Sequence, residues 1–222
     1  MRFEDAAARL ARLPDPLPDG PLELMPVLTD TRLRARSSSP TATARPASVL
    51  ALVFPDGDGE ARIVLTERVS YDGHHSGEVS LPGGKAEPRD RNVAETALRE
   101  AQEEVGLDAR GAGVEVVGVL GEVFIPVSDF RITPVVAVAR RTPRLEANPA
   151  EVASILTPPV AAFLPEARIE IVERTIRDWP LRYGGYRIDG LHVWGATGRV
   201  LGQLGAVLGR RSGGERSRSA AG

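Results

Sequence analysis

Three glutamates in the middle of the chain have the spacing that places carboxylates together on one side of a helix. The segment from Thr96 to Val105 contains no glycine or proline and is rich in Ala, Leu, Gln, Arg and Glu, so it is predicted to be helical. At about 100° per residue, Glu100, Glu103 and Glu104 fall within about 100° of one another. Like charges at this spacing repel each other, so a bound cation would stabilise the arrangement. The pattern predicts a metal site, although a glutamate-rich helix by itself is usually a solvated surface.

The residue types around this helix favour a hard divalent cation. Carboxylate oxygens without His or Cys suit Mg²⁺ or Mn²⁺ rather than zinc. The sequence Leu81-Pro82-Gly83-Gly84 precedes the helix, and paired glycines permit close backbone approach and leave a carbonyl, that of Gly84, free to join the metal shell. Arg99 lies beside the acidic face, where it is expected to orient a glutamate. This combination of carboxylates and a glycine turn is how a protein holds a divalent metal ion against phosphate.

The run from Gly84 to Leu107 resembles the Nudix box. The usual form of that box is Gly, five residues, Glu, seven residues, and then Arg-Glu-aliphatic-x-Glu-Glu-x-Gly-aliphatic. The segment that begins at Arg99, REAQEEVGL, matches every fixed position of the second half. In the first half, Asp90 stands six residues after Gly84 in place of Glu, and eight residues separate it from Arg99. The longer spacing is similar to that of the coenzyme A pyrophosphatase branch.

Segments on both sides of the box also resemble that branch. They are Leu65 to Arg68, His75 to Gly84, Val127 to Val136, Asn148 to Val152 and Val193 to Thr197, so the likeness extends roughly from Arg45 to Leu208. Two positions differ: the branch usually carries Leu-Arg where this chain has Asp72-Gly73, and Phe where it has Leu81. An arginine at the first of these positions would be a natural contact for a phosphate.

The resemblance implies metal-dependent hydrolysis of coenzyme A or acyl-CoA to 3′,5′-ADP and 4′-phosphopantetheine. The implied metal ligands are Glu100, Glu103, Glu104 and Gly84, and the implied catalytic groups are Glu103, Glu104, Arg99 and Glu151. Glu151 is included because many Nudix enzymes draw one more acid from a downstream loop; the general base stays open between Glu103 and Glu151. Two alternatives remain: hydrolysis of another nucleoside diphosphate derivative, such as ADP-ribose, NADH or a dinucleoside polyphosphate, and a non-catalytic Nudix domain that binds a nucleotide.

Four residues outside the acidic face are expected to contact the substrate. Lys85, the only lysine, directly follows Pro-Gly-Gly, where an ammonium can reach a phosphate. His75 precedes the glycine turn and is a candidate to bind a phosphate or transfer a proton. Phe130 is a candidate to stack on an adenine. Arg68 belongs to the first of the segments that resemble the branch.

Composition narrows the class of protein. A chain of 222 residues with 42% hydrophobic content is long enough for one good core, which favours a single domain with tails. A net charge of −2 argues against a nucleic-acid partner, and the absence of cysteine excludes disulfides, thiolate catalysis and Cys-ligated zinc. No apolar run approaches the roughly 18 residues that cross a bilayer, and the N-terminus lacks a secretory segment, so a cytoplasmic protein without a membrane partner is expected. The expected partner is a small coenzyme A-like diphosphate, and a homodimer is left open.

The remaining patterns predict the scaffold. Helices are expected from Glu4 to Leu13 and from Ala196 to Leu208, whereas Glu151 to Leu156 is left open between a short helix and a strand. Strands are expected at Ala47 to Phe54, Ala61 to Glu67, Val114 to Val123, Ile132 to Ala139 and Leu191 to Trp194. This order suits an α+β fold, an α/β/α sandwich with a mixed β-sheet between helices, which is also what the Nudix resemblance implies. The expected divisions are an N-terminal helix and Pro/Ser-rich segment (1–44), the Nudix hydrolase domain (45–208) and a disordered Arg/Ser/Gly-rich tail (209–222).

Overall fold

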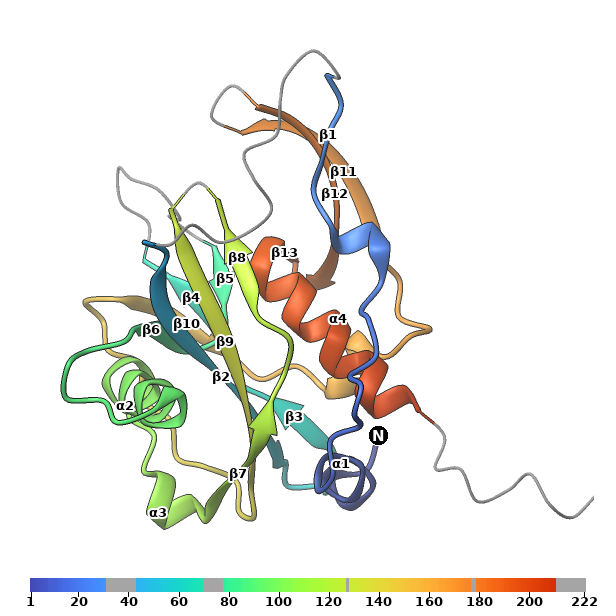
Figure 1. The fold of residues 1–222 in the computed structure, drawn as a ribbon. Coiled ribbons are helices and arrows are strands. Elements are labelled where there is room, and N and C mark those ends of the chain that lie inside the picture. Colours follow the sequence, from blue (N-terminus) through green and yellow to red (C-terminus); the bar gives the residue numbers. More distant parts are fainter. Residues whose placement is uncertain (31–42, 70–77, 127, 177–178, 211–222) are drawn as a thin grey trace, which may run out of the picture.

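A mixed six-stranded sheet forms the centre of the computed structural model, which describes residues 1–30, 43–69, 78–126, 128–176 and 179–210. Its two longest strands, β2 (Arg45–Pro55) and β9 (Phe130–Ala139), run parallel and side by side (Figure 1). The shorter strands pair antiparallel with these two: β3 (Ala61–Ile63) and β6 (Gly83–Lys85) with β2, and β7 (Val114–Val119) and β8 (Val123–Ile125) with β9. The sheet therefore holds the glycine strand β6 directly against β2.

Two smaller antiparallel sheets flank the central one. The first has the order β10 (Val152–Leu156), β4 (Leu65–Arg68) and β5 (Val79–Ser80). The second joins β1 (Val27–Leu28), β12 (Trp179–Ile188) and β11 (Glu170–Ile176), and β13 (Leu191–Trp194) also pairs with β12. The first sheet matters for the site because it places Arg68, at the end of β4, opposite the start of β10.

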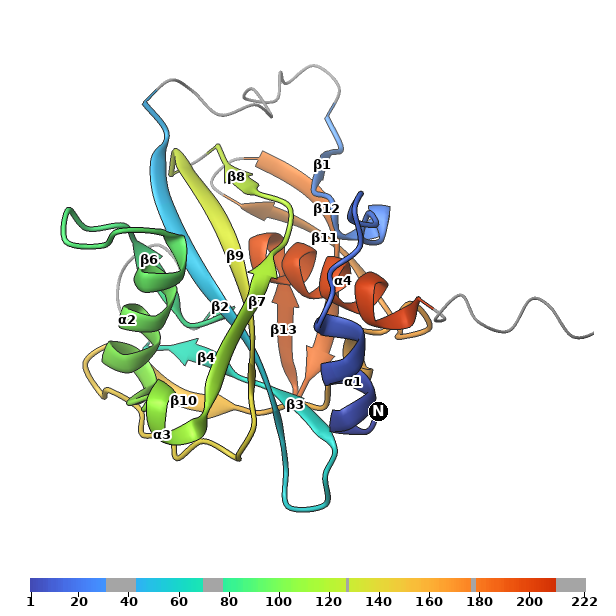
Figure 2. The same cartoon turned by 60° about the horizontal axis from the view of Figure 1, so that its bottom comes forward.

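The alternation of side chains along β2 divides the protein into two cores. Leu50, Leu52 and Phe54 belong to a buried cluster with helix α2 (Val93–Val105). The intervening Ala51 and Val53 belong to a second cluster, which contains helices α1 (Phe3–Leu10) and α4 (Gly195–Gly209). Successive strand residues point to opposite faces, so one apolar strand can fill both cores. Figure 2 shows α2 on one side of the sheet and α1 with α4 on the other, which confirms the predicted α+β sandwich.

Most of the expected elements are present, with shifted ends. The helix expected from Glu4 ends at Leu10 rather than Leu13, and the strand expected at Val114 to Val123 is divided, since it contains the whole of β7 and the first residue of β8. The segment left open after Glu151 is strand β10. The sequence patterns predicted no element between residues 157 and 190, where η2 (Val160–Phe163), β11 and β12 lie. Two short helices, η1 (Leu22–Leu24) and α3 (Ala109–Ala112), were also not predicted.

The N-terminal helix packs into the body of the protein. Phe3, Ala6 and Leu10 of α1 are buried in the same cluster as α4. Residues 31–42 of the expected Pro/Ser-rich segment and residues 211–222 of the expected tail fall outside the described residues, so the three-part division of the chain remains a prediction. None of the helices in the described ranges has the length and apolar character that crossing a membrane requires.

Candidate active site

Helix α2 has defined ends, and these set the direction of its acidic side chains. Asn92 caps the first turn: its side-chain oxygen accepts hydrogen bonds from the backbone N–H groups of Ala94 and Glu95, each at 3.0 Å. Gly106 ends the helix in the left-handed conformation, with φ of 64°. Ala97, Ala101 and Val105 pack on the sheet. The face that follows this apolar stripe carries the glutamates, as the sequence predicts.

Two of the three glutamates lie against the glycine strand. The Gly83 N–H donates to Glu104 Oε2 at 3.0 Å, and Glu104 is only 2% exposed. A methyl group on Gly84 would meet the Glu100 carboxylate, with the three nearest atoms at 2.4 to 2.6 Å. Strand β6 can approach α2 this closely only because position 84 has no side chain. The structure thus brings together Gly84, Glu100 and Glu104 from segments on either side of a loop.

Burial makes the negative charge of these two carboxylates costly. Desolvation raises the pKa of Glu104 to about 7, against the opposing effects of the Gly83 N–H and the Arg68 guanidinium. Arg68 Nη1 lies 3.7 Å from Glu104 Oε1. Desolvation also raises the pKa of Glu100, although its hydrogen bond with Arg99 lowers it. A bound cation would offset a cost that the described protein groups offset only in part.

Glu151 belongs to the same electrostatic group. Its negative charge is among the causes that raise the pKa of both Glu100 and Glu104. The backbone of Glu151 is fixed where β10 meets β4, since its carbonyl oxygen accepts from Val69 N–H at 3.1 Å. The side chain itself is exposed. An exposed carboxylate beside the buried Glu104 and the partly buried Glu100 is placed to meet solvent or substrate.

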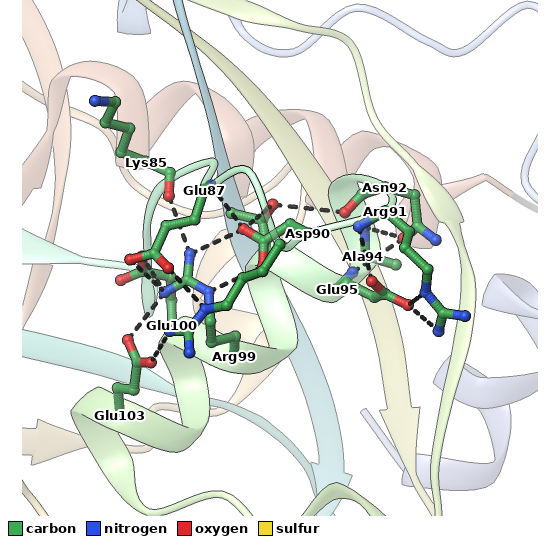
Figure 3. Close-up of polar contacts among 12 residues, drawn as sticks. Lys85, Glu87, Asp90, Arg91, Asn92, Ala94, Glu95, Arg99, Glu100 and Glu103 are labelled. Carbon is green, nitrogen blue, oxygen red and sulfur yellow. Dashed lines mark hydrogen bonds and ion pairs between the residues drawn. The ribbon is translucent and has the colours of Figure 1, made fainter.

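Arg99 lies at the centre of a network that joins the loop before α2 to the glutamates (Figure 3). Its Nε and Nη2 donate to the two oxygens of Asp90, each at 3.0 Å, and Nη2 also donates to the Lys85 carbonyl at 3.0 Å. Its Nη1 donates to Glu100 Oε1 at 2.8 Å and to Glu103 Oε2 at 2.9 Å. Arg99 therefore orients Glu100 while Asp90 holds Arg99, which is the role that the sequence assigned to this arginine.

Glu103 is the most exposed of the three glutamates, and both of its oxygens accept hydrogen bonds from arginines. Its Oε2 is bound by Arg99, and its Oε1 accepts from Arg89 Nη2 at 3.1 Å. Its side chain is 46% exposed. Within the described part of the chain, no three acidic or histidine side chains form a group that could already hold a metal ion. The pair Glu100 and Glu104, with the Gly84 backbone beside them, is the part of the predicted metal site that the fold brings together.

The donor set of this pair fits a hard divalent cation. It offers the carboxylates of Glu100 and Glu104 and the backbone of Gly84, which has no side chain. Carboxylate and carbonyl oxygens are donors of the kind that Mg²⁺ and Mn²⁺ prefer. The elevated pKa of Glu104 points the same way, because cation binding and protonation are the two means of neutralising a buried carboxylate. The residues present therefore fit the metal that the sequence predicts.

The expected substrate contacts divide among several places. Arg68 lies beside Glu104, next to the metal-binding pair. Figure 3 shows the Lys85 side chain directed away from the carboxylates, although its carbonyl is bound by Arg99. The Arg45 guanidinium covers the Phe130 ring at 4.0 Å from the ring centroid. His75 lies outside the described residues, and all four assignments remain predictions.

Sequence reasoning did not identify the roles of two residues in the loop between β6 and α2. In the sequence Asp90 stands out only as a departure from the usual glutamate, yet it binds Arg99 through both oxygens and accepts from Thr96 Oγ1 at 3.0 Å. Arg89 does not stand out at all, because an arginine in a loop is ordinarily solvated. The spacing from Asp90 to Arg99 is the available signal for the first residue, and the sequence offers none for the second.

The chain is similar to known proteins of one family. A family model described as NUDIX domain matches residues 44–179. The chain is 38% identical over 174 residues to "Nudix hydrolase 22, chloroplastic" of Arabidopsis thaliana, covering 74% of this chain and 56% of the relative. It is 33% identical over 184 residues to "Uncharacterized Nudix hydrolase NudL" of Citrobacter koseri, covering 81% of this chain and 91% of the relative.

Two further observations bear on the extent of these likenesses. The chain spans about half the length of the Arabidopsis relatives that it matches, 56% and 55%. Among solved structures it is similar to a Nudix hydrolase from M. smegmatis, RenU, with 24% identity and a TM-score of 0.45, covering 54% of this chain and 73% of that chain.

Proposed function

The chain belongs to the Nudix family, and on that premise we propose that it hydrolyses the diphosphate bond of coenzyme A or an acyl-CoA, giving 3′,5′-ADP and 4′-phosphopantetheine. One observation carries the chemistry: Glu104 is buried beside Glu100 on the glycine strand, where its charge lacks full compensation. A divalent cation held by these carboxylates would supply that compensation and would offset the charge of a diphosphate. The proposal therefore rests on a site that fits both metal and phosphate.

The residues of the site have separate proposed roles in metal binding and in positioning. Glu100, Glu104 and the Gly84 backbone would hold Mg²⁺ or Mn²⁺, and Glu103 is the remaining candidate ligand. When bound, such an ion would supply acidification of water and would offset charge on the phosphoryl oxygens. Arg99 fixes the Glu100 carboxylate, and Arg68 places a positive charge beside Glu104. A substrate diphosphate would approach this side of β6, where cationic and metal-binding groups converge.

We assign the general base to Glu151 rather than Glu103. Water attacks one phosphorus in line as the bridging P–O bond breaks; the proton of the water passes to Glu151, and the leaving phosphate takes the bond electrons. Glu151 is exposed and close enough to influence both Glu100 and Glu104, whereas both oxygens of Glu103 are bound by arginines. A carboxylate whose two oxygens both accept from guanidinium groups is less free to approach a water molecule than an exposed one.

The choice of coenzyme A rests on sequence features. The extra residue between Asp90 and Arg99 and the flanking segments support that branch of the family. Asp72-Gly73, which replaces an expected arginine, supports a second candidate, a nucleoside diphosphate derivative such as ADP-ribose, NADH or a dinucleoside polyphosphate. This second candidate uses the same site and the same chemistry, so only the substrate distinguishes the two.

Product analysis tests the proposal. The purified protein is incubated with Mg²⁺ or Mn²⁺ and, separately, coenzyme A, acetyl-CoA, ADP-ribose, NADH and a dinucleoside polyphosphate, and the products are separated by chromatography. We expect 3′,5′-ADP and 4′-phosphopantetheine from coenzyme A. Cleavage of ADP-ribose with coenzyme A untouched would replace the leading substrate by the second candidate. Binding of a nucleotide without cleavage of any compound would indicate a non-catalytic domain.

A further inference from the structure

Arg89 contacts Glu103, the most exposed of the three box glutamates. Arg89 Nη2 lies 3.1 Å from Glu103 Oε1, and Arg99 Nη1 lies 2.9 Å from Glu103 Oε2. Both oxygens of Glu103 are therefore occupied by cations of the protein itself. Glu104, by contrast, accepts a backbone N–H and, among the described cations, pairs with Arg68 at 3.7 Å.

The loop that carries Arg89 is fixed at several points. Asp90 binds Arg99 through both oxygens and also accepts from the Glu87 N–H at 2.9 Å. Arg89 Nε lies 2.7 Å from Glu87 Oε2. Asp90, the neighbour of Arg89, is thus bound to α2 through Arg99, and this contact keeps position 89 beside Glu103.

The two arginines that contact Glu103 differ in exposure and in their other partners. Arg99 is largely covered, with a side chain 13% exposed, and it also binds Asp90 and Glu100. Arg89 is 63% exposed, and it also pairs with Glu87 in its own loop. Removal of Arg99 would disturb the whole network, whereas removal of Arg89 frees one oxygen of Glu103 and leaves the contacts of Asp90 in place.

From these contacts we propose that Arg89 competes with the divalent cation for Glu103 and so lowers the metal affinity of the site. The inference rests on the proposed function, because it takes Glu100, Glu103 and Glu104 as the metal-binding set. Arg89 acts in two ways: it occupies an oxygen that a cation would use, and its positive charge repels a cation nearby. Arg89 is a positioning residue that holds the Glu103 carboxylate away from a cation bound by Glu100 and Glu104.

Arg91 supplies a matched control. It is in the same loop, carries the same charge and pairs with Glu95 on the first turn of α2, at the opposite end of the network in Figure 3. Its side chain is 85% exposed. Arg91→Gln removes one positive charge two positions from Arg89 without touching Glu103, so it measures the general effect of charge on metal binding.

Direct titration with Mn²⁺, followed by the electron paramagnetic resonance of the free ion, tests the inference without any substrate. We expect Arg89→Gln to bind Mn²⁺ about two- to fivefold more tightly than the unaltered protein, the range set by one exposed ion pair. Arg91→Gln should change the affinity less. In a Glu103→Gln background the gain from Arg89→Gln should disappear. Equal effects of the two arginine variants, or a gain that persists without Glu103, would overturn the role of Arg89.

The same titration separates this inference from the proposed function. Glu104→Gln should abolish tight Mn²⁺ binding if the metal site is where we place it. Unchanged binding in Glu104→Gln would remove the metal site and the inference with it. Loss of binding in Glu104→Gln, together with equal affinities in Arg89→Gln and Arg91→Gln, would remove only the role of Arg89. Thermal unfolding of each variant with EDTA shows whether it is folded before titration.

Discussion

Asp90 and Arg99 form a two-point ion pair: Arg99 Nε donates to Asp90 Oδ1 and Nη2 to Oδ2, each at 3.0 Å. A planar guanidinium that meets both oxygens of a carboxylate fixes the orientation of both groups. The pair closes the loop between β6 and α2 and leaves Arg99 Nη1 to bind Glu100. The longer spacing in this chain thus ends in a contact that positions a candidate metal ligand.

Replacement of Asp90 should therefore reduce turnover without removing any metal ligand. We expect Asp90→Asn to lower kcat by about tenfold to a hundredfold, because Arg99 would no longer be held beside Glu100. Asp90→Glu keeps the charge and should retain more activity than Asp90→Asn. Steady-state kinetics on the substrate found by product analysis checks this order, and full activity in Asp90→Asn would show that Arg99 is held by other contacts.

The same pair should make stability depend on pH. The hydrogen bonds from Arg99, followed by that from the Glu87 N–H, hold the pKa of Asp90 below its ordinary value of 3.8. A carboxyl with a lowered pKa in the folded state stabilises the protein above its ordinary pKa and loses this effect as the pH falls through the folded value. The difference in urea midpoint between the unaltered protein and Asp90→Asn should be full at pH 7 and shrink below about pH 4. A difference that stays constant down to about pH 3 would contradict the assignment.

Glu104→Gln should stabilise the protein in the absence of metal. With its pKa raised to about 7, Glu104 carries a costly buried charge at pH 8, whereas a glutamine at this position can still accept the Gly83 N–H. We expect a gain of about 1–3 kcal/mol in unfolding free energy at pH 8 with EDTA. Added Mn²⁺ should raise the Tm of the unaltered protein and leave that of Glu104→Gln unchanged. A less stable Glu104→Gln would mean that Arg68 and Gly83 already compensate the charge.

Gly84→Ala should damage the site because of its side chain alone. The new methyl group would lie 2.4 to 2.6 Å from three atoms of the Glu100 carboxylate, so that carboxylate must move. We expect metal affinity and kcat to fall by about tenfold or more. Gly57→Ala, in the hairpin loop, is the control: its new methyl group would have no described atom within 4 Å outside its chain neighbours, and it should behave like the unaltered protein. Equal Mn²⁺ affinity in both variants would place the metal elsewhere.

Glu151 and Glu103 should affect different parameters. We expect Glu151→Gln to lower kcat by about a hundredfold or more while Mn²⁺ affinity changes little, as suits a general base outside the metal shell. Glu103→Gln should instead alter metal affinity. A pH–rate profile of kcat/KM checks the assignment, because its acidic limb should be lost in the variant that lacks the base. Loss of that limb in Glu103→Gln, and its retention in Glu151→Gln, would reverse the assignment.

The local parts of the site were predictable because they depend on neighbours in the chain. Helix α2 follows from the propensities of Thr96 to Val105, and the left-handed Gly106 ends it where expected. The strands expected at Ala47 to Phe54 and Ala61 to Glu67 correspond to β2 and to β3 with β4. Helix α4 was harder to expect, since it holds several glycines, but its buried leucines gave the helical period.

Elements whose stability comes from distant partners escaped prediction. Strands β11 and β12 alternate imperfectly, and β12 includes two glycines, so only their pairing with each other and with β13 defines them. A methyl group on Gly205 would lie 1.7 Å from the Phe163 carbonyl oxygen, so the glycine that weakens α4 locally is what lets η2 pack on it. Tertiary contact outweighed propensity at both places.

The sequence by itself predicted the acidic helical face, the close approach of the paired glycines and a site suited to a hard cation, because residue type and helical spacing are local properties; that the glycines form strand β6 was not predicted. Only the tertiary structure decided that Glu100 and Glu104 face β6 while Glu103 is held by Arg89 and Arg99. It also brought Glu151 to the site across the pairing of β10 with β4. These outcomes depend on which segments fold against one another, and burial and charge then give identical side chains different properties.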